Sequence, residues 1–361
     1  MKLRLSVLLV LVAIIAAACS NGSTSPSPSE DAAEPSTPAA SDAPASAAAS
    51  EAAGPGEPEA DTIRVGFASQ PDFTQVMNFK WLDDLEAEGF TVEDNYFESS
   101  QDAFRALVAG EVDVAVGTLL SAILLVQESG EGVKVIASDL QAPDYLLISQ
   151  PDVTSLDQLE GARVGISTPG DISDTLTRVV LDREGIDLDA VDFVQIGGTG
   201  ARMAALLEGQ IEAGPAHAAE GLTAAEEGLS NLFAYGTAVP DYLQHGLIVT
   251  DEWISTNPNL TQIMVDLFVE STRWANDNKD EYIALSADTV EGPSDAARDE
   301  AYEIFQEISM FAINGGMSEE LLQNTVDIEK EVGTLGDDAP ALDEWSDPSF
   351  VESYLERFGE Q

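Results

Sequence analysis

Short apolar runs alternate with longer amphipathic segments from about Asp61 onward. The run 63–67 is partly β-branched and meets a polar segment at 69–72, which predicts a strand followed by a loop. Segment 73–88 carries apolar residues at helical spacing before Gly89, which predicts a helix that ends there. The same alternation predicts strands at 91–97, 112–116, 133–137 and 145–149, with helices at 101–109 and 118–128.

After segment 153–161 the pattern restarts, and from Pro258 onward it is mostly helical. Strands alternating with helices are typical of α/β proteins, in which mostly parallel sheets carry helices on both faces. This second half predicts strands at 163–167, 191–196, 211–213, 232–235 and 247–250, and helices at 173–184, 201–207, 218–228, 259–276, 295–313 and 318–332.

Two segments of the chain recur 99 residues downstream. Segment 65–72 is similar to 164–171, and segment 104–114 is similar to 203–213. Strand, turn and helix units can look alike by convergence, but two matches in the same order and at the same offset favour structural duplication. Two similar units predict two lobes, and a cleft between lobes is a usual place for a small molecule to bind.

The amino terminus has the pattern of an export signal. Residues 1–18 begin with basic residues and continue as an uncharged apolar run, which is typical of a secretory signal peptide. Cys19, the single cysteine, follows directly, and the segment resembles a bacterial lipobox in which this cysteine carries a lipid. The alternative is an ordinary signal peptide in which Cys19 is incidental. Segment 20–60 has no aromatic residue, Lys or Arg, which predicts a disordered tether behind the lipidated residue.

The formal net charge of the chain is −51. Such a charge argues against binding to nucleic acid or to anionic lipid, because phosphate recognition needs clusters of Lys and Arg. The acidic residues are spread along the body, which is typical of a solvated surface suited to high salt. Cation binding is the sharper alternative, but His217 and His245 are the two histidines and no close ligand cluster accompanies them. We therefore expect neither a metal nor a cofactor.

Ligands on α/β sheets bind in the loops that follow the carboxyl ends of the strands. The loops after the repeated strands therefore supply the candidate ligand contacts. His217 is equally interpretable as a ligand contact or as a structural residue at a helix start. Phe73 and Tyr235 offer stacking surface, although aromatic side chains are more often part of the core. The candidates are Ser69, Gln70, Asp72, Phe73, Thr118, Thr168, Asp171, Thr199, His217 and Tyr235.

These loops allow opposite interpretations of the charge of the ligand. Thr168 and Thr199 lie just before predicted helices, whose amino termini favour anions such as sulfonate, carboxylate or phosphate. The alternative is that these loops only cap their helices. Asp72, Asp171 and Asp174 near the same openings would repel an anion, and they fit a neutral or cationic ligand better.

Several segments resemble the substrate-binding lipoproteins of ABC importers, in the NMT1/THI5-like group that includes aliphatic sulfonate (SsuA-like), nitrate, taurine and thiamine-precursor binders. Each segment alone is common strand–helix sequence, but their order and spacing are more specific, and the resemblance covers roughly 61–332. The segments that carry it are 63–66, 106–115, 156–165, 205–213 and 274–278.

The resemblance implies a two-lobed periplasmic-binding-protein type II fold. One lobe would comprise 61–149 plus 246–361 and the other 150–245, with crossing strands near 145–149 and 247–250 as a hinge. It further implies a monomer, lipid-anchored to the outer face of the cytoplasmic membrane, that passes a small organic ligand to an ABC permease and its ATPase. The ligand could be a sulfonate, a pyrimidine, a flavin-like compound or another small molecule. Segment 70–78 does not match the sulfonate or nitrate binders, so the ligand itself does not carry over.

Two other functions remain as alternatives. Pyrimidine synthases share this fold, but their chemistry is histidine-based and cysteine-rich, whereas this chain has two histidines and no cysteine besides Cys19. We therefore expect no enzyme. An exported ligand-sensing module without a transporter is the second alternative, and the sequence does not distinguish it from an importer component.

Overall fold

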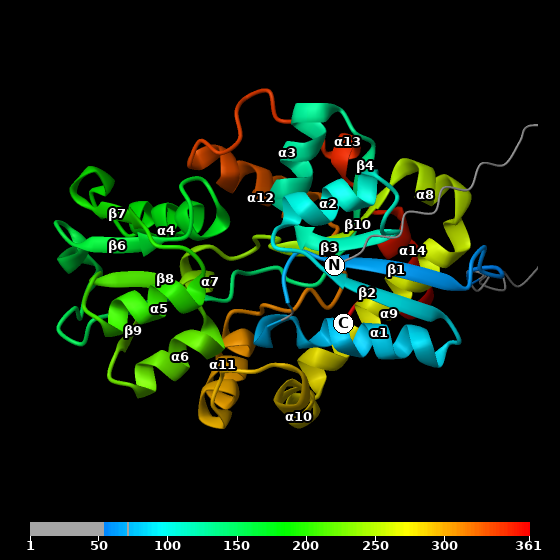
Figure 1. The fold of residues 1–361 in the computed structure, drawn as a ribbon. Coiled ribbons are helices and arrows are strands. Elements are labelled where there is room, and N and C mark those ends of the chain that lie inside the picture. Colours follow the sequence, from blue (N-terminus) through cyan, green and yellow to red (C-terminus); the bar gives the residue numbers. More distant parts are fainter. Residues whose placement is uncertain (1–53, 71) are drawn as a thin grey trace, which may run out of the picture. The chain divides into compact units, whose positions relative to one another are not determined.

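The computed structural model describes residues 54–70 and 72–361 (Figure 1). These residues belong to the compact unit that spans Ser50–Gln361. The predicted signal peptide, Cys19 and residues 20–53 of the predicted tether lie outside the described residues. Among the described helices, none has the length and apolar character needed to cross a membrane.

Two five-stranded sheets form the framework. The first has the order β2-β1-β3-β10-β4 and the second the order β7-β6-β8-β5-β9. In each sheet four strands run in one direction, and the fifth, β10 or β5, is antiparallel to both neighbours. The strands are β1 (Thr62–Phe67), β2 (Thr91–Tyr96), β3 (Val114–Thr118), β4 (Val133–Ser138), β5 (Tyr145–Ser149), β6 (Arg163–Ile166), β7 (Asp192–Gln195), β8 (Ala213–His217), β9 (Ser230–Ala234) and β10 (His245–Thr250).

Helices follow the strands as the hydrophobic pattern predicts. The first sheet carries α1 (Val76–Ala87), α2 (Ser100–Val108) and α3 (Leu119–Ser129), with a 3₁₀ turn η1 (Phe73–Gln75) before α1. The second carries α4 (Ile172–Arg183), α5 (Thr199–Leu207), α6 (Ala218–Glu226) and the short α7 (Tyr235–Ala238). The remaining helices are α8 (Asp251–Thr256), α9 (Pro258–Asp277), α10 (Lys279–Thr289), α11 (Asp295–Glu307), α12 (Glu319–Glu331), α13 (Leu342–Trp345) and α14 (Ser349–Phe358).

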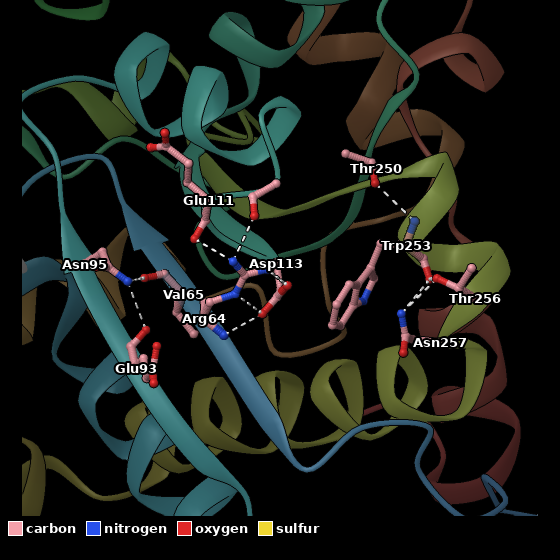
Figure 2. Close-up of polar contacts among 11 residues, drawn as sticks. Arg64, Val65, Glu93, Asn95, Glu111, Asp113, Thr250, Trp253, Thr256 and Asn257 are labelled. Carbon is pink, nitrogen blue, oxygen red and sulfur yellow. Dashed lines mark hydrogen bonds and ion pairs between the residues drawn. The ribbon is translucent and has the colours of Figure 1, made fainter. Parts of the chain in front are cut away.

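The matching strand orders agree with the duplication that the sequence repeat predicts. A pair of equivalent contacts makes the match specific. The Arg64 backbone N–H and Nε donate to Asp113 Oδ2 at 2.8 and 3.0 Å (Figure 2). In the second sheet the Arg163 backbone N–H and Nε donate to Glu212 Oε2 at 2.8 and 3.1 Å. The two partners of each pair are 49 residues apart in the sequence. Each pair links a residue of one strand, β1 or β6, to the residue just before the neighbouring strand, β3 or β8.

The strand β8 lies later than the expected 211–213. Pro215 stands in its middle, and the absence of a proline N–H argues against an interior strand position. The structure tolerates it because β6 pairs with β8 only at Val164 and Ala213, whereas β5 pairs along its whole length. The proline therefore does not interrupt the central pairing.

The chain crosses between the sheets at two places, and one differs from the expected boundary. It leaves the first sheet after Ser138 and enters the second at Tyr145, so β5 belongs to the second sheet and not to the first. It returns through 235–244 and enters the first sheet at His245. All five residues of β5 are buried, and a mostly apolar run does not specify which sheet it will join.

The carboxyl-terminal region also divides differently from the expectation that 246–361 joins the first lobe. Helix α11 lies beside α6 of the second sheet (Figure 1). The Ser294 hydroxyl, which caps α11, donates to Glu226 of α6 at 2.7 Å. Helix α12 contacts α4, and Arg183 Nη2 lies 2.8 Å from Glu331 Oε2. An amphipathic pattern predicts a buried face but not the partner that covers it.

Gly246, near the second crossing, has no room for a side chain. A Cβ atom added there would lie 2.6 Å from the Ala137 carbonyl oxygen, which belongs to the backbone of neighbouring β4. We predict that Gly246→Ala lowers the free energy of unfolding by about 1–3 kcal/mol, because the paired strands must separate to admit the methyl group. Denaturant unfolding of the exported domain measures this.

The matched control for this substitution is Gly54→Ala, where nothing lies within 4 Å of an added Cβ. We expect the control to unfold with the wild type. Equal stability of the Gly246 and Gly54 variants would contradict the close approach of β10 and β4.

Candidate functional site

A polar cluster joins the two sheets where the chain crosses between them. His217 is the last residue of β8, and its Nδ1 lies 2.9 Å from Asp144 Oδ2. Its Nε2 lies 3.6 Å from Oδ2 of Asp72, which follows β1 of the first sheet. Asp144 is the last residue of the first crossing segment, immediately before β5. The three side chains therefore come from the first sheet, the second sheet and the connection between them.

Strand pairing explains why these groups meet. β5 is antiparallel to β8, and its register places Tyr145 directly opposite His217. The two ring centroids are 4.5 Å apart, and the Tyr145 hydroxyl lies 3.4 Å from His217 Nε2. Because Asp144 precedes Tyr145, its carboxylate reaches the other imidazole nitrogen. Thr74 in η1 donates its hydroxyl to Asp144 Oδ2 at 2.5 Å, which brings the first sheet's loop into the same network.

The cluster is partly open to solvent. The side chains of His217 and Asp72 are 20% and 21% exposed, whereas that of Asp144 is fully buried. Asp72 also caps η1, because its Oδ1 accepts the Thr74 N–H at 2.9 Å. An arriving molecule could therefore reach Asp72 and His217, while Asp144 supports the imidazole from behind.

The electrostatics of the pair favour its charged form. Burial alone would lower the pKa of His217, but the carboxylate of Asp144, with Tyr145 and Asp72, raises that pKa well above its ordinary value. Burial would raise the pKa of Asp144, but the His217 charge and hydrogen bonds from His217 and Thr74 hold it below its usual range. His217 and Asp144 thus form a buried ion pair, which is favourable only while both partners are present.

The second histidine has the opposite protonation state. Burial, together with the charge of His217, lowers the pKa of His245 to about 4. His245 Nδ1 lies 2.8 Å from Gln75 Nε2, an amide nitrogen that can only donate. Near neutral pH, Nδ1 of His245 therefore accepts this hydrogen bond and the ring carries its proton on Nε2.

Several buried polar atoms beside the cluster lack a hydrogen-bond partner within residues 54–70 and 72–361: Asn78 Oδ1, Asp139 Oδ1, Glu220 Oε2 and both amide atoms of Gln244. Burial raises the pKa of Asp139 to about 7 and that of Glu220 to about 7. The charge of Asp72 adds to both shifts, so both carboxyls lie within its electrostatic reach.

Comparisons with known proteins place the fold and the family. The NMT1/THI5-like family model matches residues 85–282. The chain belongs to the NMT1/THI5-like family. A search of curated proteins found no match.

Solved structures of solute-binding proteins share the fold of this NMT1/THI5-like chain. The nitrate-binding protein NrtA of Synechocystis PCC 6803 superposes with a TM-score of 0.68 at 14% identity, covering 84% of this chain and 90% of that one. A putative sulfonate-binding SsuA of Methylobacillus flagellatus KT gives 0.65 at 16% identity over 82% and 94% of the two chains. The ligand-binding component of an ABC-type import system of Staphylococcus aureus, with zinc bound, gives 0.66 at 16% identity over 81% and 98%. These likenesses confirm the predicted two-sheet α/β fold.

The neighbour with bound zinc does not imply a metal site in this chain. Within the described residues, no group of three or more His, Cys, Asp or Glu side chains is arranged to hold a metal ion. In this structure His217 is hydrogen-bonded to Asp144 at 2.9 Å and lies 3.6 Å from Asp72.

The structure brings some of the candidates together and separates others. Asp72 and His217 meet in the cluster, and Thr118 pairs with His245 across β3 and β10. Ser69 and Gln70 lie exposed in the loop after β1. Their role as ligand contacts stays a prediction.

The two aromatic candidates are fully buried. Phe73 packs against Tyr282 and Phe305, with ring centroids 5.3 and 5.6 Å away. The Tyr235 hydroxyl lies 2.7 Å from the Thr177 hydroxyl. Both side chains support the site from the core in this conformation.

The sequence allowed the interpretation that the loops before α4 and α5 only cap these helices. A side chain caps α4 but not α5. Asp171 does cap α4, because it accepts the Asp174 N–H at 3.1 Å. Thr199 does not cap α5; it accepts a hydrogen bond from Arg202 Nη2 at 3.1 Å. Thr168 is exposed, with Gln195 Nε2 at 3.5 Å from its hydroxyl.

Sequence reasoning missed five members of the cluster and its surroundings: Thr74, Gln75, Asp144, Glu220 and His245. Of these five, Asp144 alone carried a signal in the sequence, because it is an aspartate directly before a mostly apolar strand. The other four residues reach the cluster through the pairing of particular strands, and the sequence alone does not indicate that pairing.

The buried carboxyl of Asp139 predicts a pH dependence. The pKa of Asp139 is about 7 in the folded chain and near its ordinary value of 3.8 in the unfolded chain. Between these values the folded chain binds more protons than the unfolded chain, so stability falls as pH rises from about 4 to 7. Asp139→Asn removes this contribution and keeps the shape. We predict that Asp139→Asn loses less stability than the wild type over this range, by an amount on the order of 1 kcal/mol or more.

Denaturant unfolding at several pH values measures the difference, with exposed Asp152→Asn as the matched control. A variant whose pH profile parallels that of the wild type would show that Asp139 is ionised in the folded chain without penalty.

Proposed function

We propose that the protein is an extracytoplasmic solute-binding lipoprotein that captures a small organic molecule between its two lobes and delivers it to an ABC importer. The observation that carries this proposal is the polar cluster built from both sheets. Asp72 comes from the first sheet and His217 from the second, and both remain partly exposed. A molecule bound to both side chains would hold the lobes together.

The fold offers a route for opening and closing. Two crossing segments, 139–144 and 235–244, connect the sheets, and a few residues in such connections absorb the rotation of one lobe against the other. A ligand favours the closed form only by the contacts it makes there and not in the open form. Contacts to Asp72 and His217 together meet this requirement, because the two residues lie on different lobes.

Binding without catalysis fits the state of His217. A general base near neutral pH must be unprotonated when it acts. The neighbouring carboxylates raise the pKa of His217 well above its ordinary value, so its imidazole remains protonated there. We therefore favour a binding protein over an enzyme.

Lipid anchoring belongs to the same proposal. Cys19 follows an export-type segment, and a lipid on this residue would keep the binding domain at the outer face of the cytoplasmic membrane, near a permease. The neighbouring solved structures include the ligand-binding component of an ABC-type import system, which supports a role in import.

Native mass spectrometry of the freshly purified exported domain tests the binding function. We predict a retained small molecule in the wild type and its loss in His217→Gln, because the substitution removes the charge that organises Asp72 and Asp144. Asp152→Asn, on the exposed surface, is the matched control and keeps the ligand.

Circular dichroism establishes that each variant is folded. Absence of any retained molecule in the wild type, together with no thermal shift by sulfonates, nitrate, pyrimidines, flavins, aromatic acids or amines, would overturn the proposed function.

A further inference from the structure

The geometry of the interlobe cluster points to a ligand that carries a positive charge, a protonated amine or a quaternary ammonium group. This inference rests on the proposed function and names the chemical class of its ligand. It follows from three features of the cluster: a surplus of carboxylates, buried polar oxygens without donors, and the absence, among residues 54–70 and 72–361, of an uncommitted Lys or Arg beside them.

Carboxylates outnumber cations in the cluster. Asp144 is compensated, because it accepts from Thr74 at 2.5 Å and lies 2.9 Å from His217 Nδ1. Asp72 is not compensated to the same extent. His217 Nε2 lies 3.6 Å from its Oδ2, beyond hydrogen-bond distance, and its Oδ1 accepts the Thr74 backbone N–H at 2.9 Å. One imidazolium thus faces two carboxylates, and the less satisfied of the two is also the more exposed.

Buried polar oxygens without a partner lie within the electrostatic reach of Asp72. Asp139 and Asn78 are fully buried, and each has an Oδ1 atom without a partner among the described residues. Asn78 lies one helical turn beyond Thr74, and its amide nitrogen is 3.4 Å from the other oxygen of Asp139. Glu220 lies in the first turn of α6, which begins after His217, and its buried Oε2 also has no hydrogen-bond partner among the described residues.

Asn78 Oδ1 can only accept a hydrogen bond, and the carboxyls of Asp139 and Glu220, whose pKa values lie at about 7, accept only when they are ionised. A cation bound nearby favours their ionised form and supplies the donors that all three oxygens lack. An ammonium group brings up to three N–H donors and no acceptor. A sulfonate, nitrate or carboxylate would bring only further acceptors to a site that already has a surplus. Leaving buried acceptors unsatisfied costs free energy, so a cationic ligand gains where an anionic one loses.

Arg202, whose charge acts on Tyr145 of the cluster, offers no free charge to an anion. Arg202 is 2% exposed and donates to the carbonyl oxygens of Pro215 at 2.7 Å and Gly197 at 2.5 Å, and to the Thr199 hydroxyl at 3.1 Å. Within the described chain, no Lys or Arg forms an ion pair with Asp72, Asp144 or Glu220. His245 is uncharged near neutral pH.

Thermal-shift and calorimetric titrations with matched compounds test the charge of the ligand. Butylamine and butyltrimethylammonium are compared with butanesulfonate and butyrate, which share the four-carbon chain, and with sodium nitrate. We expect the cations to raise the melting temperature in a saturable manner and the anions to leave it unchanged. Asp72→Asn should weaken cation binding by about tenfold or more, as the loss of a charged hydrogen-bonding partner does.

Glu220→Gln is a second variant and should weaken the same compounds if Asp72→Asn does not fold, whereas Asp152→Asn should bind as the wild type. Binding of butanesulfonate, butyrate or nitrate but not of the cations would overturn this inference and leave the proposed function standing. Binding of no compound, with no molecule retained by the purified protein, would overturn both.

Discussion

The ion pair between His217 and Asp144 is the contact on which the arrangement at the lobe junction depends. It joins the end of β8 to the crossing segment, and Thr74 extends it to the first sheet. Both partners are largely withdrawn from water, so each stabilises the charge of the other, and removal of one would leave a buried charge without compensation. Asp72, whose partly exposed carboxylate is open to a ligand, lies beside this ion pair and is not one of its two partners.

The duplication explains why the cluster forms at this place. Residues 118 and 217 end equivalent strands, and β10 and β5 are the equivalent reversed strands that pair with them. The first sheet pairs Thr118 with His245, and the second pairs His217 with Tyr145. Two copies of one framework thus present different side chains toward the same junction. The framework is kept by equivalent contacts such as Arg64–Asp113 and Arg163–Glu212, on the segments before β3 and β8.

Hydrophobic periodicity and the repeat predicted the α/β class and most strands and helices. They also made Asp72 and His217 candidate ligand contacts. They did not predict that β5 joins the second sheet or that α11 packs on α6, because an apolar run or face does not identify its partner. Asp144 and His245 were missed for the same reason. Their roles arise from strand register, which brings together residues about 70 and 170 positions from their partners in η1. Phe73 and Tyr235 were proposed as stacking surfaces for a ligand, and their burial assigns them to the core in this conformation.

The most direct test of this account is an NMR titration of the histidine rings, because the chain contains only two histidines. The account predicts that His217 remains an imidazolium to a pH well above the ordinary histidine range, while His245 stays neutral down to about pH 4. It also predicts that Asp144→Asn moves the His217 titration downward. Two histidines that both titrate near the free value, without response to Asp144→Asn, would contradict the charged pair at the lobe junction.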